Sequence, residues 1–236
     1  GMFRYTVPKL AYVDAIRRAD AVVAQTEYQQ RTLERMFDIR SHVVPNVYSI
    51  PPQDDLVAAT DRSFVLWVGS RGPGQKKPMR FLRLAARLPP VEFFLIGWSQ
   101  DGEFRTEIRD RAEALSNLRF EGFVPPDEID EHYRRAVAYV NTSAHEGFPN
   151  TFLEAWRFAV PVVSMRAILD GLLTEADIGY QTGTVDGMAQ TVDTLWNDRD
   201  EVAVTGRNGR EHLRANYAMD AVYETYAEVF GDVVAD

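Results

Sequence analysis

The chain has 236 residues, of which 45% are hydrophobic and 26% charged, a composition typical of globular proteins rather than disordered or fibrous ones. It contains no cysteine, which excludes disulfide scaffolds and thiol nucleophiles, and its net charge of −9 argues against nucleic acid as a partner. No apolar run approaches the ~20 residues of a membrane-spanning helix, and the N-terminus lacks a signal-peptide pattern, so we expect no transmembrane segment and a cytoplasmic location.

The N-terminal part predicts a short stretch of α/β structure followed by a linker. Thr26 and Gln29 have the spacing of a helix capping box. The polar, proline-containing residues that follow predict an irregular connection. The elements expected here are a strand at 19–25, a helix at 26–37, a strand at 42–46 and a linker at 46–63.

From residue 64 onward, short apolar strands alternate with amphipathic helices. This alternation predicts an α/β fold, a doubly wound, Rossmann-like parallel sheet that is covered by helices on both faces. The strands are expected at 64–69, 92–98, 118–123, 138–143 and 161–165. The helices are expected at 78–88, 103–115, 125–136, 150–159, 186–197, 201–216 and 219–230.

One segment reverses the acidic character of the chain. Residues 71–90 contain no acidic side chain and six basic ones, Arg71, Lys76, Lys77, Arg80, Arg83 and Arg87. A solvated helix face explains the three basic residues at 80, 83 and 87. The three loop residues better fit a small anionic ligand, because ligands of open parallel sheets bind beyond the carboxyl ends of the strands.

The segment 142–155, with the sequence TSAHEGFPNTFLEA, carries the densest signal for a ligand site. Asn150 is a candidate N-cap, and the amides of Thr151 and Phe152 would then point out of the helix start, where anions bind. Glu146 and Glu154 flank this position. Carboxylates beside an anion site fit a ligand that also has hydroxyl groups, so the pattern suggests a nucleotide-sugar.

The same residues carry a resemblance to a known family. EGFPNTFLEA, at 146–155, is similar to the two-glutamate signature of the retaining family 4, or group 1, glycosyltransferases, and the chain resembles their C-terminal, donor-binding GT-B domain. Similarity extends to ADAVVAQTEYQQRTL at 19–33, VVPN at 43–46, LRFEGFVPPDEI at 118–129 and PVVS at 161–164.

The resemblance implies roles for individual residues. Glu154 would bind the ribose hydroxyls, and Glu146 would lie near the donor sugar. Arg71 and a lysine, Lys77 rather than Lys76, would clamp the diphosphate and stabilise charge on the leaving group. The resemblance implies no metal and no cofactor besides the donor substrate, and it leaves the acceptor unknown. It places further donor contacts at Gly69, Phe123, Val124, Gly147, Phe148, Pro149, Asn150 and Thr151.

The chain also departs from the family pattern. Val160 stands where many members have glycine, and RAILDG at 166–171 replaces an expected glycine pair. Residues 1–45 match only the end of the N-terminal acceptor domain, 46–63 are the linker, and 64–236 are the donor domain. We therefore expect the N-terminal half to be mostly missing and the chain to be incomplete for catalysis alone. A nucleotide-sugar epimerase of the same fold and a non-catalytic nucleotide-sugar binding module remain alternatives.

Overall fold

The computed structural model describes residues 6–70, 75–98, 102–144, 148–166 and 171–235. The chain divides into two compact units, Ile50–Leu213 and Gly1–Ser49 together with Arg214–Asp236. These limits differ from the expected boundaries: the expected linker 46–63 is divided between the units, and the residues from 214 onward group with the N-terminal ones. The interpretation of residues 1–45 as part of an acceptor domain stays a prediction.

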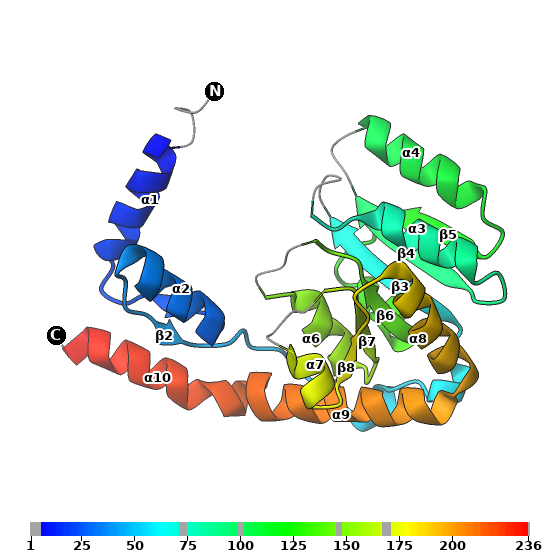
Figure 1. Ribbon diagram of the computed structural model, residues 1–236. Coiled ribbons are helices and arrows are strands. Elements are labelled where there is room, and N and C mark those ends of the chain that lie inside the picture. Colours follow the sequence, from blue (N-terminus) through cyan, green and yellow to red (C-terminus); the bar gives the residue numbers. More distant parts are fainter. Residues whose placement is uncertain (1–5, 71–74, 99–101, 145–147, 167–170, 236) are drawn as a thin grey trace. The chain divides into compact units, whose positions relative to one another are not determined.

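The larger unit contains a sheet of six parallel strands (Figure 1). The strands are β3 (Phe64–Ser70), β4 (Phe93–Trp98), β5 (Leu118–Gly122), β6 (Ala136–Asn141), β7 (Val162–Ser164) and β8 (Gly179–Gln181). Their order is β5-β4-β3-β6-β7-β8, so the winding direction reverses between β3 and β6. This confirms the predicted doubly wound sheet and puts its switch point, where such sheets bind ligands, at the ends of β3 and β6.

Helices cover both faces of this sheet. One face carries α3 (Pro78–Arg87), α4 (Gly102–Glu113) and α8 (Val185–Asn197), and the other carries α5 (Ile129–Arg134) and α6 (Asn150–Arg157). The remaining elements are two 3-10 turns, η2 (Gln53–Asp55) and η3 (Ala59–Asp61), a short helix α7 (Leu172–Glu175), and α9 (Arg199–Tyr217), which continues past the boundary of the unit.

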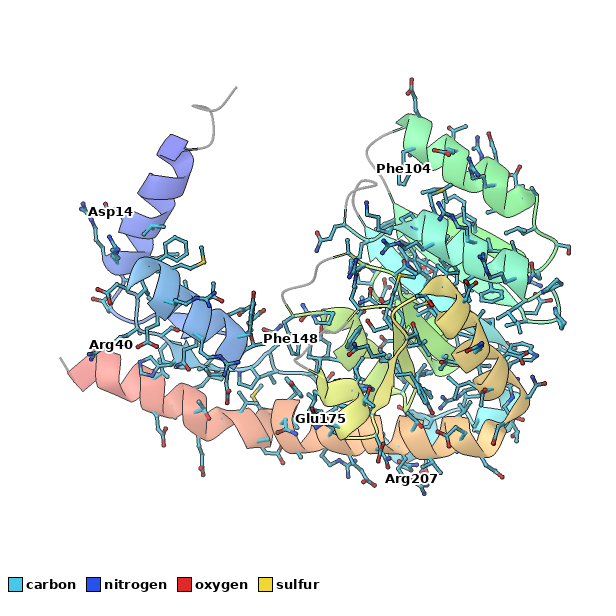
Figure 2. The ribbon with its side chains drawn as sticks, viewed as in Figure 1. Asp14, Arg40, Phe104, Phe148, Glu175 and Arg207 are labelled. Carbon is cyan, nitrogen blue, oxygen red and sulfur yellow. The ribbon has the colours of Figure 1, made fainter. Side chains whose placement is uncertain are left out.

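The two faces have different cores, although both are fully packed with side chains (Figure 2). The α3/α4/α8 face is largely aliphatic, with Phe81 and Trp67 among its few aromatic residues. The α5/α6 face holds a chain of buried rings, in which Tyr139 of β6 contacts Tyr133 and Phe152 at centroid distances of 5.8 and 6.2 Å. Because strand side chains alternate between faces, residues at the end of β6 point alternately into these two environments.

The smaller unit consists of α1 (Thr6–Arg17), β1 (Val23–Ala24), α2 (Glu27–Phe37), β2 (His42–Val43) and α10 (Met219–Ala235), and β1 pairs with β2 in parallel. The predicted capping by Thr26 is confirmed, since its hydroxyl accepts from the Gln29 amide at 3.1 Å. The Gln29 side chain reaches back to the Gln25 amide at 2.8 Å instead of to Thr26. No helix among the residues that the structure describes is long and apolar enough to cross a membrane.

Some elements differ from the sequence prediction. The helix expected at 125–136 is shorter, because residues 125–128 form a turn in which the Glu128 amide donates to the Pro125 carbonyl at 3.0 Å. The strand expected at 138–143 ends at Asn141, so residues 142 and 143 leave the sheet and line its carboxyl edge. The helices α1 and α7 and the strand β8 were not predicted.

Candidate functional site

The candidate site lies at the switch point of the larger unit, where the loop after β3, the loop after β6 and the start of α6 follow the carboxyl ends of adjacent strands. Three of the predicted site residues, Arg71, Glu146 and Gly147, lie outside the described residues. The other predicted residues are described, and their contacts and burial follow.

The end of β3 is shaped by an indole ring. Gly69 pairs with Gly97 of β4, and a Cβ atom on Gly69 would lie 2.5 Å from Cη2 of Trp67. A Cβ atom on Gly97 would lie 3.1 Å from the same ring and 2.8 Å from the Gly69 carbonyl oxygen. Glycine is therefore required at position 69 by the Trp67 ring and at position 97 chiefly by the Gly69 carbonyl oxygen, independently of the ligand contact predicted for Gly69.

The described residues of the basic loop after β3, 75–77, form hydrogen bonds to the residues that follow β6. Thr142, which is completely buried, donates its hydroxyl to the Lys76 carbonyl at 2.7 Å. The Ala144 amide donates to the Gln75 carbonyl at 2.8 Å, and the Arg80 guanidinium donates to the Thr142 carbonyl at 3.2 Å. These bonds hold two consecutive carbonyl groups of the basic loop against the neighbouring loop of the switch point.

Lys77 has an unusual backbone conformation. It precedes the first residue of α3 with φ 51° and ψ 53°, in the left-handed region, and it provides no side-chain cap for the helix. Residues with a Cβ atom seldom adopt this region, and a following proline such as Pro78 favours extended backbone in the residue before it. Lys77 therefore occupies a strained turn whose backbone directs the chain from the basic loop into α3.

Glu154 extends from α6 into the aromatic face of the sheet. The Tyr133 hydroxyl donates to its Oε2 atom at 2.7 Å. Burial raises the pKa of the Glu154 carboxyl, and the charge of Asp130 adds to this effect. The Tyr133 hydrogen bond and the charges of Arg157 and Lys76 act in the opposite direction and lower that pKa. The carboxyl is thus a largely desolvated acid held in place by a phenol.

Lys76 and Glu154 belong to elements on either side of the switch point, since Lys76 follows β3 and Glu154 lies in the helix after β6. The charge of Lys76 lowers the pKa of the Glu154 carboxyl and is the smallest of the effects on it. A cation of the basic loop thus acts on a partly buried acid across the switch point.

The start of α6 differs by one residue from the prediction. Asn150 was expected to cap the helix, but Pro149 is the cap residue and Asn150 is the first helical residue, with no side-chain cap bond. The Phe152 amide donates to the Pro149 carbonyl at 2.8 Å, so the prediction that this amide points out of the helix toward an anion is wrong. Thr151 Oγ1 is buried and has no hydrogen-bond partner among the described residues.

Three further predicted residues, Phe148, Phe123 and Val124, lie close to the edge of the site. Phe148, labelled in Figure 2, precedes the helix cap and is half-buried. Phe123 directly follows Gly122, which has φ 70° at the end of β5, and its side chain is 66% exposed. Val124 is buried. An exposed aromatic ring at the carboxyl edge of the sheet offers an apolar surface to a planar ligand group.

Sequence reasoning missed three residues of this site: Tyr133, Trp67 and Thr142. Tyr133 lies in a segment that was predicted to be helical, and a buried phenol usually has a hydrogen-bond partner, but nothing in the sequence identifies Glu154 as that partner. The sequence analysis assigned no role in the site to Trp67, and it assigned none to Thr142 although this residue begins the predicted ligand segment 142–155. Their contact depends on β3 and β6 being neighbours, which the strand order alone reveals.

The comparisons with known proteins agree with this architecture. In structure, sucrose-phosphate synthase from Thermosynechococcus elongatus matches 99% of this chain and 63% of its own with a TM-score of 0.82 and 19% identity. HepE from Anabaena, solved in complex with UDP and glucose, matches 98% of this chain and 68% of its own with a TM-score of 0.80 and 20% identity. The fold is the Rossmann-like fold of GT-B proteins.

The sequence comparisons identify the family to which the chain belongs. A family model described as "Glycosyl transferases group 1" matches residues 62–198. The lipopolysaccharide core biosynthesis mannosyltransferase LpcC of Rhizobium leguminosarum bv. viciae is 30% identical over 94% of this chain. The core biosynthesis glycosyltransferase LpsE of Rhizobium meliloti is 27% identical over 63% of it. The chain belongs to the group 1 glycosyltransferase family, which confirms the predicted resemblance. It spans 67% of the length of LpcC and 44% of that of LpsE.

Proposed function

We propose that the larger unit binds a nucleoside-diphosphate sugar and serves as the donor half of a retaining glycosyltransferase. The observation that carries this proposal is Glu154, a partly buried carboxyl at the switch point whose pKa is raised by desolvation and which a Tyr133 hydroxyl holds in place. A desolvated carboxylate gains most from neutral hydroxyl donors, and the two hydroxyls of a ribose supply them.

The diphosphate is assigned to the basic loop. We assign the positive charges to Arg71 and Lys76. We choose Lys76 over Lys77 because Lys77 occupies the left-handed turn that leads into α3, while the Lys76 carbonyl is bonded to Thr142 beside the carboxyl end of β6. Two fixed cations beside the bond that breaks would stabilise the negative charge that develops on the departing nucleoside diphosphate. We propose that this pair acts without a metal ion.

The donor sugar is assigned to the loop before α6. Glu146 and the backbone between Gly147 and Thr151 would contact it, and Phe123 and Val124 would border the base. HepE was solved with UDP and with UDP-glucose, which makes UDP the first ligand to test. We assign neither the acceptor nor the transfer step to particular residues of this chain.

Calorimetric titration with UDP, GDP and ADP, and with the matching nucleosides, tests the proposal. We expect one diphosphate to bind at least about tenfold more tightly than its nucleoside, because the loop cations contact only the phosphates. Glu154→Gln should weaken the nucleoside and the diphosphate alike. Glu211→Gln, at an exposed position of α9, is the matched control and should change neither. Binding that Glu154→Gln leaves unchanged would contradict the ribose assignment.

A further inference from the structure

We propose that Thr142 is a positioning residue that sets the location of Lys76 for diphosphate binding. The inference rests on the proposed function for its ligand and on the observed hydrogen bonds for its geometry. Thr142 is completely buried directly after β6, and its side chain lies between the core of the sheet and the backbone of the basic loop.

The direction of the Thr142 hydroxyl proton follows from its neighbours. Trp67 Nε1 lies 2.9 Å from Thr142 Oγ1, and an indole nitrogen can only donate. The hydroxyl oxygen therefore accepts from Trp67, and its single proton is available to a carbonyl group. The Lys76 carbonyl lies at 2.7 Å and the Lys77 carbonyl at 3.1 Å, so the shorter bond to Lys76 receives the proton.

The indole that orients this hydroxyl is itself fixed. Trp67 is 3% exposed, it contacts Phe81 of α3 at a centroid distance of 6.3 Å, and its ring lies against the positions of Gly69 and Gly97. A side chain at either glycine would displace it. The donor at Trp67 Nε1 is thus fixed within the core. Because Thr142 bonds both to this donor and to the Lys76 carbonyl, it links the basic loop to the core.

The basic loop needs such an external restraint. The next residue, Lys77, is held in the left-handed region before Pro78, a conformation that persists only where surrounding contacts enforce it. A lysine side chain has four rotatable bonds, so the location of its ammonium group depends strongly on where its backbone is anchored. Anchoring the Lys76 carbonyl limits the positions that its ammonium group can reach, on the side of the switch point where the proposed function assigns the ribose to Glu154.

Thr142→Val tests this inference because it removes the hydroxyl and keeps the shape of the side chain. We expect UDP affinity to fall about tenfold and uridine affinity to change by less than about twofold. Thr142→Ser, which keeps the hydroxyl, should restore UDP binding. Thr191→Val is the matched control: its hydroxyl bonds to the Gly187 carbonyl at 3.1 Å inside α8, and its loss should leave both affinities unchanged.

A second measurement needs no ligand. Hydrogen exchange of the peptide 75–80 should be faster in Thr142→Val than in the unmodified chain, while peptides from α8 should exchange at the same rate. If Thr142→Val does not fold, Trp67→Phe takes its place, since it keeps an aromatic ring and removes the donor that orients the hydroxyl. Faster exchange of 75–80 in that variant would support the inference.

Two results would overturn it. Unchanged UDP affinity with unchanged exchange of 75–80 would show that Thr142 does not restrain the loop. Equal losses for UDP and uridine together with a lower melting temperature would show a role in stability alone. Failure of the unmodified chain to bind any nucleoside diphosphate would instead contradict the proposed function, and the exchange measurement would still decide whether Thr142 anchors Lys76.

Discussion

The two faces of the sheet hold opposite charges at the switch point in different ways. On the α5/α6 face, a direct side-chain bond from Tyr133 fixes the carboxyl of Glu154. On the α3/α4/α8 face, the Thr142 hydroxyl donates to the backbone carbonyl of Lys76, so this hydrogen bond acts on the main chain and not on the charged group. The acid is therefore held at its own carboxyl, whereas the Thr142 bond acts on the cation through its backbone.

The largest expected effect comes from removing the cation itself. Lys76→Ala and Arg71→Ala should each weaken UDP binding by roughly 1–3 kcal/mol, because each removes a charge-assisted hydrogen bond to phosphate. Uridine affinity should change little. Lys77→Ala is the matched control in the same loop, and calorimetry with both ligands distinguishes the two lysines. A larger loss for Lys77→Ala than for Lys76→Ala would assign the diphosphate contact to Lys77.

Removing the Tyr133 hydroxyl tests how the carboxyl of Glu154 is held. Tyr133→Phe eliminates the hydroxyl that donates to Glu154 and should weaken uridine and UDP equally, by about 1 kcal/mol. An equal loss of affinity for uridine and UDP distinguishes this variant from substitutions of Arg71 or Lys76, which should weaken the binding of UDP alone. Tyr226→Phe, in the smaller unit, serves as the control. A loss confined to UDP would show that Tyr133 does not act through Glu154 on the proposed ribose contact.

The pH dependence of binding reports on the same acid. Burial raises the pKa of Glu154, and only the ionised carboxylate accepts hydrogen bonds from two ribose hydroxyls. Uridine affinity should therefore decrease as the pH is lowered, by up to about tenfold per pH unit once the carboxyl is protonated. The decrease should begin at a higher pH than the value of about 4.3 of an exposed glutamate. Titration calorimetry between pH 4 and 8 measures it, and Glu154→Gln should abolish the dependence.

The raised pKa also has a consequence for stability. A carboxyl whose folded pKa lies above its unfolded value stabilises the fold below the unfolded pKa, and this contribution is lost as the pH rises through the folded pKa. At neutral pH, ionisation of Glu154 therefore lowers the free energy of unfolding of the ligand-free protein. Urea unfolding can measure the free energy of unfolding of Glu154→Gln and of the unmodified chain at pH 4 and pH 8. The difference between the two proteins should favour Glu154→Gln more at pH 8 than at pH 4.

The sequence predicted the α5/α6 side of the site, with Glu154, better than the link between Trp67 and Thr142 on the other side. Glu154 was placed on the correct helix, because its motif combines a turn with apolar positions at helical spacing. The start of that helix was off by one residue, since Asn150 has the stronger intrinsic preference for the cap, yet Pro149 occupies it. The link from Trp67 to Thr142 spans 75 positions in the sequence. It exists only because β3 and β6 are adjacent, which short-range patterns cannot reveal.

The smallest expected effect concerns the strain in the basic loop. Lys77→Gly should raise the free energy of unfolding by up to about 1 kcal/mol, because glycine adopts positive φ without a steric penalty, and its greater freedom in the unfolded chain offsets part of the gain. Lys76→Gly is the matched control. Lys76 is not among the residues with positive φ, so glycine there brings only the entropic cost and should lower stability. Urea unfolding of both variants measures the difference. If Lys77→Gly keeps full UDP affinity, the conformation at residue 77 serves only to turn the chain and is not needed to position Lys76. A stability gain accompanied by a loss of UDP affinity would instead show that the strained turn is part of the diphosphate site.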